Sequence, residues 1–226
     1  GWSRFRRRSV LINAVLLIAA IFLVIQMSDH LKDNQWDFKT YYYAAKVAAE
    51  GGDPYNVDLA RGMAGGYVHQ YLYPPMAIRL FRPFTYLSFE TAREIWFWLR
   101  VVLLIALVWV WRRILAGSDR MWIFYLLAIV AFNDSLYLDL KAGNVTIIEQ
   151  LLLWLGFLCL VNRRVAWFCA LVVVASLLKG LPLLFLGLLI LLSIKRRWIY
   201  VLGSTAAFGL IHLIDFVLNP KWYGQF

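Results

Sequence analysis

The sequence predicts an all-α polytopic membrane protein, a bundle of about seven transmembrane helices, and three observations support this fold class. Of the 226 residues, 62% are hydrophobic, and the mean hydropathy of +0.68 is well above what the core of a soluble domain requires. The apolar residues form separate long runs. The net charge of +10 falls between those runs instead of on one polar module, so we expect no nucleic acid as a partner.

The first apolar run, residues 9–27, follows an arginine-rich N-terminus. At about 1.5 Å per residue, a helix of this length crosses most of a bilayer core of ~30 Å. No small-x-small cleavage site follows the run, so we predict an uncleaved span and not a signal peptide. Six later apolar runs complete the predicted bundle: residues 96–111, 121–132, 145–161, 165–178, 181–194 and 198–218.

Basic residues occupy every second connection between these runs, at residues 112–120, 163–164 and 195–197. With the N-terminal arginines, these connections hold about half of the 23 Lys and Arg but only one of the 13 acids, Asp119. The positive-inside rule then places the N-terminus in the cytoplasm. The alternation requires that residues 73–87 do not cross, and we predict a helix lying in the membrane interface there.

Residues 28–95 therefore form a long outer segment after the first span, within a single polytopic domain of residues 1–226. In this segment we predict a short helix over residues 38–50, capped by Asp37, ended by Gly51 and followed by a turn at residues 52–54. Helical spacing places five residues on one face of it: Phe38, Tyr41, Tyr42, Ala45 and Ala49. We expect this juxtamembrane helix to lie on the outer surface.

The runs at residues 165–178 and 181–194 are too short to reach the outer surface. Each has about 14 residues, or roughly 21 Å of helix, so the tip at residues 179–182 is expected below that surface. A charged side chain costs about 2.5–3.5 kcal/mol at the centre of a membrane helix. Ionisable residues nevertheless lie near the outer ends of the predicted spans: Arg93, Arg100, Asp134, Asp139, Lys141, Glu149, Lys179, His212 and Asp215. A polar cavity that opens to the outer leaflet accounts for this distribution.

Each candidate site residue also has an ordinary structural interpretation. Asp37 can act above the cavity or only cap a helix. Lys179 can bind an anion such as a lipid phosphate, or can reach water or pair with Glu149 or Asp215. The stretch from Lys141 to Asn144 opens a span, where backbone N–H groups either meet an anion or simply begin a helix.

Other charged residues give weaker indications. Arg79 and Arg82, three residues apart, can contact a lipid headgroup or another phosphate. We interpret His212 and Asp215 as a structural polar pair. Asp29 and Asp33, which precede Asp37 at a spacing of four, are predicted to be solvated, and we expect no metal site. The two cysteines lack the spacing of a zinc site.

Several short motifs follow one another between residues 35 and 195: Asp37-Phe38 with Tyr41, Tyr42, Ala44 and Ala45; Gly52-Asp53-Pro54-Tyr55; Tyr73-Pro74-Pro75; Gly143-Asn144; and Leu178-Lys179 with Pro182. Their order resembles glycosyltransferase family 87. That family contains polytopic enzymes of the GT-C fold, among them mannosyltransferases that use polyprenyl-phosphomannose. The resemblance implies a GT-C-like bundle in which an acid of the first outer loop is the general base, a role that falls to Asp37.

The resemblance further implies inverting sugar transfer from a polyprenyl-phosphate donor to an acceptor glycan or glycolipid, without a cofactor. The reaction would take place on the outer face of a bacterial plasma membrane. Candidates to bind the donor phosphate are Lys179, Arg79 and Lys141, and candidates to bind substrate are Tyr41, Tyr73 and Asn144. Members often carry Gly-Gln where this chain has Gly143-Asn144, and further spans after the seventh, so we expect the N-terminal part of a longer chain.

Two other functions stay open at the level of sequence. A non-catalytic GT-C-like subunit or assembly factor would keep the fold and bind membrane lipid within a larger complex. A transporter of small solutes would explain polar residues in spans, but it requires a polar path to both sides. The nearly uncharged inner halves of the predicted spans argue against a transporter.

Overall fold

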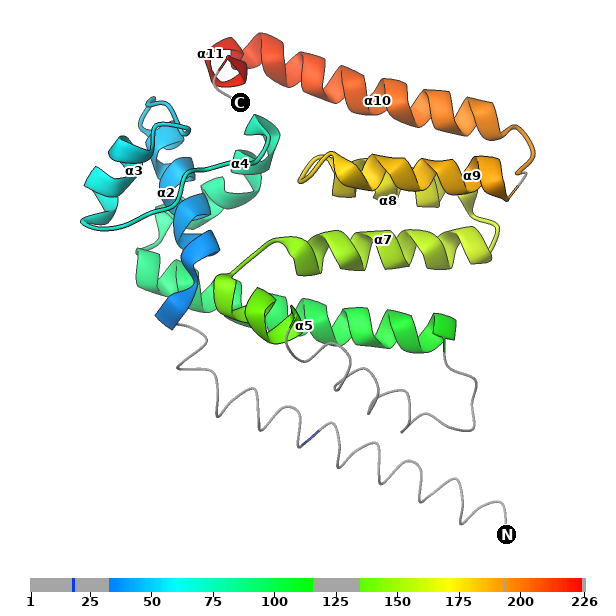
Figure 1. Cartoon of the computed structure of the whole chain (residues 1–226), viewed down its shortest axis with the longest axis horizontal. Coiled ribbons are helices and arrows are strands. Elements are labelled where there is room, and N and C mark those ends of the chain that lie inside the picture. The colour runs from blue at the N-terminus through cyan, green and yellow to red at the C-terminus, as the bar shows by residue number, and fades with distance from the viewer. Residues whose placement is uncertain (1–17, 19–32, 116–134, 193, 225–226) are drawn as a thin grey trace.

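The computed structural model describes residues 18, 33–115, 135–192 and 194–224, and these form helices without any strand among them (Figure 1). Apart from residue 18, the predicted spans at residues 9–27 and 121–132 lie outside these ranges. The elements are α2 (Trp36–Ala49), α3 (Val57–Ala64), α4 (Pro75–Phe81), η1 (Arg82–Tyr86), α5 (Phe89–Leu115), α7 (Thr146–Val161), α8 (Val165–Ser176), η2 (Leu181–Leu186), α9 (Gly187–Leu191), α10 (Arg197–Leu218) and α11 (Pro220–Tyr223).

The long helices pack side by side in the order α5, α7, α8 and α10 (Figure 1). Among the described residues, two helices are long and apolar enough to cross a membrane, Phe89–Ile114 and Arg197–Leu218. Three apolar helices are shorter: Thr146–Val161, Val165–Ser176 and Leu181–Leu191. The all-helical class is therefore confirmed and is compatible with a membrane protein, while the bundle of about seven spans stays a prediction.

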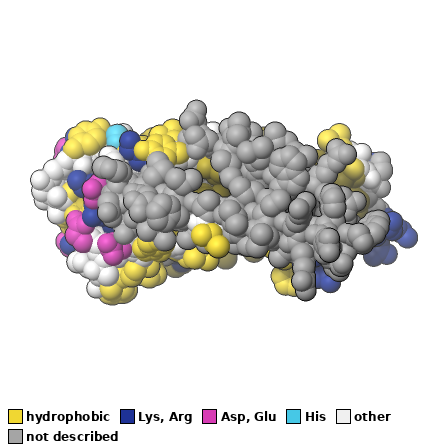
Figure 2. Space-filling view, turned by 90° about the horizontal axis from the view of Figure 1, so that it is seen from below, with side chains coloured by type: hydrophobic (Ala, Val, Ile, Leu, Met, Phe, Trp, Pro, Cys, Tyr) yellow, Lys and Arg dark blue, Asp and Glu magenta, His cyan; other side chains and the backbone are white. Residues whose placement is uncertain are grey.

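The predicted hairpin of residues 165–194 is present, because α8 packs against η2 and the chain reverses between them. The turns that hold residues 163–164 and 195–197 lie at the same end of the bundle as the C-terminal end of α5 (Figure 1). Figure 2 shows Asp and Glu side chains only at the opposite end, on the face that it presents. The described part of the chain thus separates charge along the bundle as the sequence predicted, and its orientation in a membrane stays a prediction.

Helix α2 is buried in the protein on more sides than its single apolar face predicts, while its place at the outer surface of a membrane stays a prediction. Eight of its 14 residues are buried: Phe38, Thr40, Tyr41, Tyr42, Tyr43, Ala44, Ala45 and Val47. Ala49, predicted on the buried face, is exposed. Residues of α3, α4, η1 and α5 cover the helix on several sides, so a one-sided apolar pattern was the wrong expectation. We call residues 36–86 the aromatic unit.

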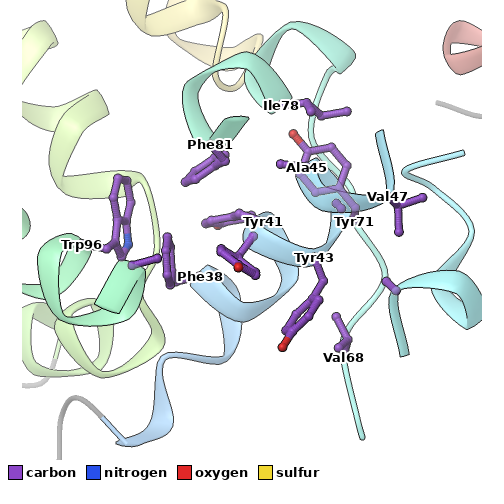
Figure 3. Close-up of a cluster of buried hydrophobic side chains, with 14 of the residues drawn as sticks. Phe38, Tyr41, Tyr43, Ala45, Val47, Val68, Tyr71, Ile78, Phe81 and Trp96 are labelled. Carbon is purple, nitrogen blue, oxygen red and sulfur yellow. The ribbon is translucent and has the colours of Figure 1, made fainter. Parts of the chain in front are cut away.

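Aromatic rings fill the interior of this unit (Figure 3). The ring of Phe38 stacks on Trp96 with centroids 5.4 Å apart and meets the edge of Phe84 at 5.6 Å. Tyr41 packs on Phe81 at 4.5 Å. Offset and edge-to-face pairs of this kind contribute about 0.5–1.5 kcal/mol each beyond area burial. The aromatic side chains of α2 therefore hold this helix against α4 and α5.

The ends of α2 correct one prediction and confirm another. Asp37 does not cap the helix, since α2 begins at Trp36 after Gln35 and Asp37 lies inside the first turn. The helix ends at Ala49, and Gly51 adopts φ +82°, where glycine is favoured, while its N–H donates to the carbonyl of Ala48. Residues 73–87 also contain the predicted helix, as α4 followed directly by η1, and its place in a membrane interface stays a prediction.

Candidate active site

Asp37 meets a residue that lies 107 positions later in the chain. Asn144 Nδ2 donates a hydrogen bond of 2.7 Å to Asp37 Oδ2 and a second, of 3.2 Å, to the hydroxyl of Tyr73. Asn144 Oδ1 accepts from the backbone N–H of Thr146 at 3.0 Å and from its hydroxyl at 2.7 Å. The amide is therefore fixed at the start of α7, with its NH₂ group directed at the carboxylate.

Gly143 makes this approach sterically feasible. Its φ is +82°, and a Cβ atom there would lie 2.8 Å from Phe38 Cβ and 3.1 Å from the backbone N of Phe38. Trp96 Nε1 donates to the Gly143 carbonyl at 2.8 Å. A glycine is thus required for both the backbone conformation and the contact. In the Gly143-Asn144 pair, Gly143 therefore allows the α2 backbone to approach closely, and Asn144 binds Asp37.

A buried arginine stabilises the contact between the start of α2 and the segment before α7. Arg100 of α5 is fully buried and donates to the side-chain oxygen of Gln35 at 2.7 Å and to the carbonyls of Asp139 and Leu140 at 2.6 and 2.7 Å. Gln35 Nε2 donates to the same Leu140 carbonyl. These bonds join the start of α2 to the segment before α7, so they hold Asp37 and Asn144 in register.

Lys179 reaches the same site from the tip of the α8–η2 hairpin. Its Nζ atom donates to Thr146 Oγ1 at 3.0 Å and to Asn144 Oδ1 at 3.4 Å, and it lies 3.5 Å from Glu149 Oε2. It also lies 5.7 Å from the centre of the Tyr73 ring. The expected pairing of Lys179 with Glu149 is present, and 34% of the lysine side chain stays exposed. One amide, Asn144, thus contacts both an anion and a cation.

Two tyrosines complete the site. Tyr41 donates to the Tyr73 hydroxyl at 2.8 Å, and the two rings meet edge to face at 5.0 Å. Burial raises the pKa of Tyr41 far above its ordinary value, so the hydroxyl stays a neutral donor at every physiological pH. We call the set the polar cluster: Asp37, Tyr41, Tyr73, Asn144, Thr146, Glu149 and Lys179.

The electrostatics of Asp37 suit a proton acceptor. Burial raises the pKa of the carboxyl above 3.8, its ordinary value, and the Asn144 hydrogen bond and the charges of His69, Lys179 and Arg100 act against that rise. A partly desolvated carboxylate is a stronger base than one in water. Its Oδ2 atom is bound by Asn144, and no hydrogen bond to Oδ1 is found among the described residues. Oδ1 can therefore receive a proton from a bound hydroxyl group.

Comparison with known families now adds to this geometry. The model of glycosyltransferase family 87 matches residues 71–225, more than two thirds of the chain. The chain belongs to glycosyltransferase family 87. No curated protein and no solved structure matches it. Membership implies sugar transfer between a donor and an acceptor.

The family 87 match contains three members of the polar cluster that the sequence analysis named, Tyr73, Asn144 and Lys179, whereas Asp37 and Tyr41 precede it. All five lie together in the structure. Arg79 and Lys141 do not join them. Arg79 forms an ion pair with Asp215 of α10, and Lys141 lies 5.8 Å from the ring of Tyr137.

Three other charged candidates of this family 87 chain, His212, Asp215 and Asp33, have structural partners. Tyr223 connects the predicted pair: it lies 3.1 Å from His212 Nδ1 and donates to Asp215 Oδ2 at 3.1 Å. Asp33 is exposed and pairs with Arg93 at 3.8 Å, and Asp29 lies outside the described residues. Within the described ranges, no group of three or more His, Cys, Asp or Glu side chains is arranged to hold a metal ion.

Sequence reasoning missed Thr146 and gave Asp139 no site role. Burial raises the pKa of Asp139 to about 6, while Arg100, Lys179 and a hydrogen bond with Thr146 lower it. Two of these three partners, Lys179 and Thr146, belong to the polar cluster, so Asp139 is a third carboxyl at this site, beside Asp37 and Glu149 of the cluster. The position of Thr146 two residues after Asn144 was the one available signal, because that spacing is typical of a side chain that caps the following turn.

Proposed function

We propose that the chain transfers a sugar from a polyprenyl-phosphate donor to a hydroxyl group of a glycan or glycolipid acceptor, with inversion at the anomeric carbon. The observation that carries this proposal is the convergence of Asp37, Asn144 and Lys179 from three distant segments. A base and a cation on either side of one amide are the groups that such a transfer requires.

In the proposed step the acceptor oxygen attacks the anomeric carbon from the face opposite the phosphate. The bond between that carbon and the phosphate oxygen breaks, and the bonding electrons leave with the polyprenyl phosphate. Asp37 Oδ1 takes the proton of the acceptor hydroxyl, and Lys179 stabilises the charge of the departing phosphate. General-base catalysis of this kind contributes about 10²–10⁴-fold.

Asn144 keeps the two charges of the site apart. Its Nδ2 atom contacts the carboxylate and its Oδ1 atom contacts the ammonium group, so the amide separates Asp37 from Lys179. A direct ion pair would lower the pKa of Asp37 and weaken it as a base. The lysine pairs instead with Glu149, which offsets part of its charge without blocking the exposed third of its side chain.

A lipid-linked donor fits the position of the site. The polar cluster lies at the end of the helical bundle that is opposite the basic turns, between the aromatic unit and the start of α7 (Figure 1). If α5 and α10 cross a membrane, this end faces outward by the positive-inside rule. The prenyl chain can then stay in the bilayer while its phosphate reaches Lys179.

The decisive experiment uses purified full-length protein in lipid nanodiscs with a polyprenyl-phosphate sugar. Asp37→Asn keeps the shape of the side chain, and we expect transfer to fall by about 10²–10⁴-fold with donor binding retained. Asp33→Asn removes a nearby exposed acid and serves as the matched control. Lys179→Ala should weaken donor binding about tenfold or more, and Lys179→Arg should retain part of it.

Unchanged transfer in the Asp37→Asn variant would exclude this residue as the base. Undiminished donor binding in Lys179→Ala would exclude the phosphate role. Absence of transfer by the wild-type protein, together with its recovery in a fixed ratio with a larger complex, would instead favour the non-catalytic subunit.

A further inference from the structure

A cavity lies away from the polar cluster, between α2, α4, η1, α10 and α11. Its volume is about 230 Å³, and it shares no lining residue with the cluster. One wall is apolar and consists of Ala45, Ala48 and Ala49 from the last turns of α2. Arg79 of α4 and Arg82 of η1 also line the cavity. The cavity thus combines small apolar side chains with two guanidinium groups.

Only one of the two arginines has a charge that is not compensated. Arg79 pairs with Asp215, which is almost fully buried and also accepts hydrogen bonds from Asn219 and Tyr223. The side chain of Arg82 is exposed and forms no ion pair or hydrogen bond with any residue of the described ranges. A guanidinium fork binds the oxygens of a phosphate in a bidentate manner. The cavity can therefore bind one anionic group such as a phosphate through Arg82.

The position of the cavity indicates where the anion comes from. Leu218, which lines the cavity, is the last residue of α10, and α10 is one of the two described helices able to cross a membrane. Its neighbours Leu213, Ile214 and Val217 are exposed, as they would be toward lipid. Trp222 also lines the cavity, and tryptophan is enriched at the level of lipid headgroups. The end of a span is the level at which lipid phosphates lie.

We infer that this cavity binds the phosphate group of a membrane lipid, with Arg82 as the ionic contact and the alanine wall beside the glycerol or prenyl carbons. The site is distinct from the one that contains Asp37, and it does not depend on the role of Asp37 in transfer. Arg79 keeps its pairing with Asp215 and forms the rim of the cavity.

The experiment measures lipid binding and not activity, so its outcome is independent of the proposed reaction. Full-length protein in a neutral detergent is titrated with phosphatidylglycerol and examined by native mass spectrometry. We expect Arg82→Gln to weaken binding about five- to tenfold, in line with the loss of one charge-assisted contact. Arg61→Gln removes one charge at the same end of the molecule, outside the cavity, and should leave binding unchanged.

A second variant tests the cavity without a change of charge. Ala48→Phe places a ring in the cavity, and we expect it to weaken lipid binding as much as Arg82→Gln does. Competition with inorganic phosphate and with a polyprenyl phosphate distinguishes the sources of the anion. Displacement by inorganic phosphate in the wild type and not in Arg82→Gln supports a general phosphate site. Preference for the polyprenyl phosphate supports a second site for the carrier.

Two results would overturn the inference. One is equal binding of phosphatidylglycerol by the wild type and by both cavity variants. The other is an equal loss of binding in Arg61→Gln, which would show that the lipid responds only to overall charge.

Discussion

Helices α2 and α10 differ in how many of their side chains are buried in the protein. Helix α2 contains two lysines, Lys39 and Lys46, and three consecutive tyrosines, yet eight of its 14 residues are buried in protein. Helix α10 is far more apolar, yet only Ser204 and Asp215 of its 22 residues are buried. From apolar character alone, α10 would be expected to be the more buried of the two helices. The difference teaches that burial around α2 follows the packing of aromatic rings, whereas the more apolar α10 leaves most of its side chains uncovered by the described residues.

The two helices also use polar residues differently. In α2 the polar groups Asp37 and Tyr41 point into the polar cluster, so burial tunes their chemistry. In α10 the single buried charge, Asp215, accepts from Arg79 and attaches the helix to α4. A buried carboxylate without a partner costs several kcal/mol, so this contact is the main polar restraint between α10 and the aromatic unit.

The largest difference in stability between the packing around α2 and the surface of α10 is expected when a tryptophan in each is replaced by alanine. Trp96 is fully buried against Phe38 and donates to the Gly143 carbonyl, so Trp96→Ala should lower the free energy of unfolding by about 3–5 kcal/mol. Trp198 in the first turn of α10 is 54% exposed, and Trp198→Ala should cost less than about 1 kcal/mol. Denaturant unfolding in detergent measures both. Trp96 lies on α5 and packs against α2, so equal losses would show that the contacts around α2 are no more buried than the surface of α10.

A smaller effect is expected from alanine at glycine. Gly143→Ala places a methyl group 2.8 Å from Phe38 Cβ at φ +82°, and we expect a loss of roughly 1–3 kcal/mol together with reduced transfer. Gly203 of α10 has no atom within 4 Å of an added Cβ, so Gly203→Ala should be neutral or stabilise the helix by up to about 1 kcal/mol. Thermal unfolding of both variants tests this. A stable Gly143→Ala protein would contradict the close approach of α2 and residue 143.

The sequence predicted the apolar helices well because hydropathy and basic turns mark their limits. Residues 145–161 and 198–218 agree with α7 and α10 to within one residue at each end. The burial of α2 could not be predicted, since it depends on coverage by α3, α4 and η1, and no local pattern reports such coverage. The predicted start at residue 38 was two residues too late, because α2 begins at Trp36 and Asp37 lies inside its first turn.

The site was predicted in part, and mainly through family resemblance. Asp37, Asn144 and Lys179 were named before the structure brought them together, but their spacing along the chain contains no physical signal of contact. The partners of Arg79 and Lys179 show the limit of charge reasoning. Glu149 was one of two acids proposed for Lys179 and is its partner, whereas the other acid, Asp215, pairs with Arg79. Which acid each cation meets depends on helix packing, which a linear sequence does not specify.

The smallest expected effect is a shift in the pH dependence of transfer. It tests whether burial of α2 in the protein raises the pKa of Asp37. Asp37 must be ionised to accept a proton, so transfer should fall as the pH drops through its pKa. Because burial raises that pKa, the acid limb should lie above the value for a solvated aspartate. The Asn144 hydrogen bond lowers the pKa, so Asn144→Ala should move the limb to still higher pH. Initial rates of transfer against pH measure this, with Asp33→Asn as a control that leaves the limb in place. A limb that moves to lower pH in Asn144→Ala would show that another group, and not Asp37, limits the reaction in acid.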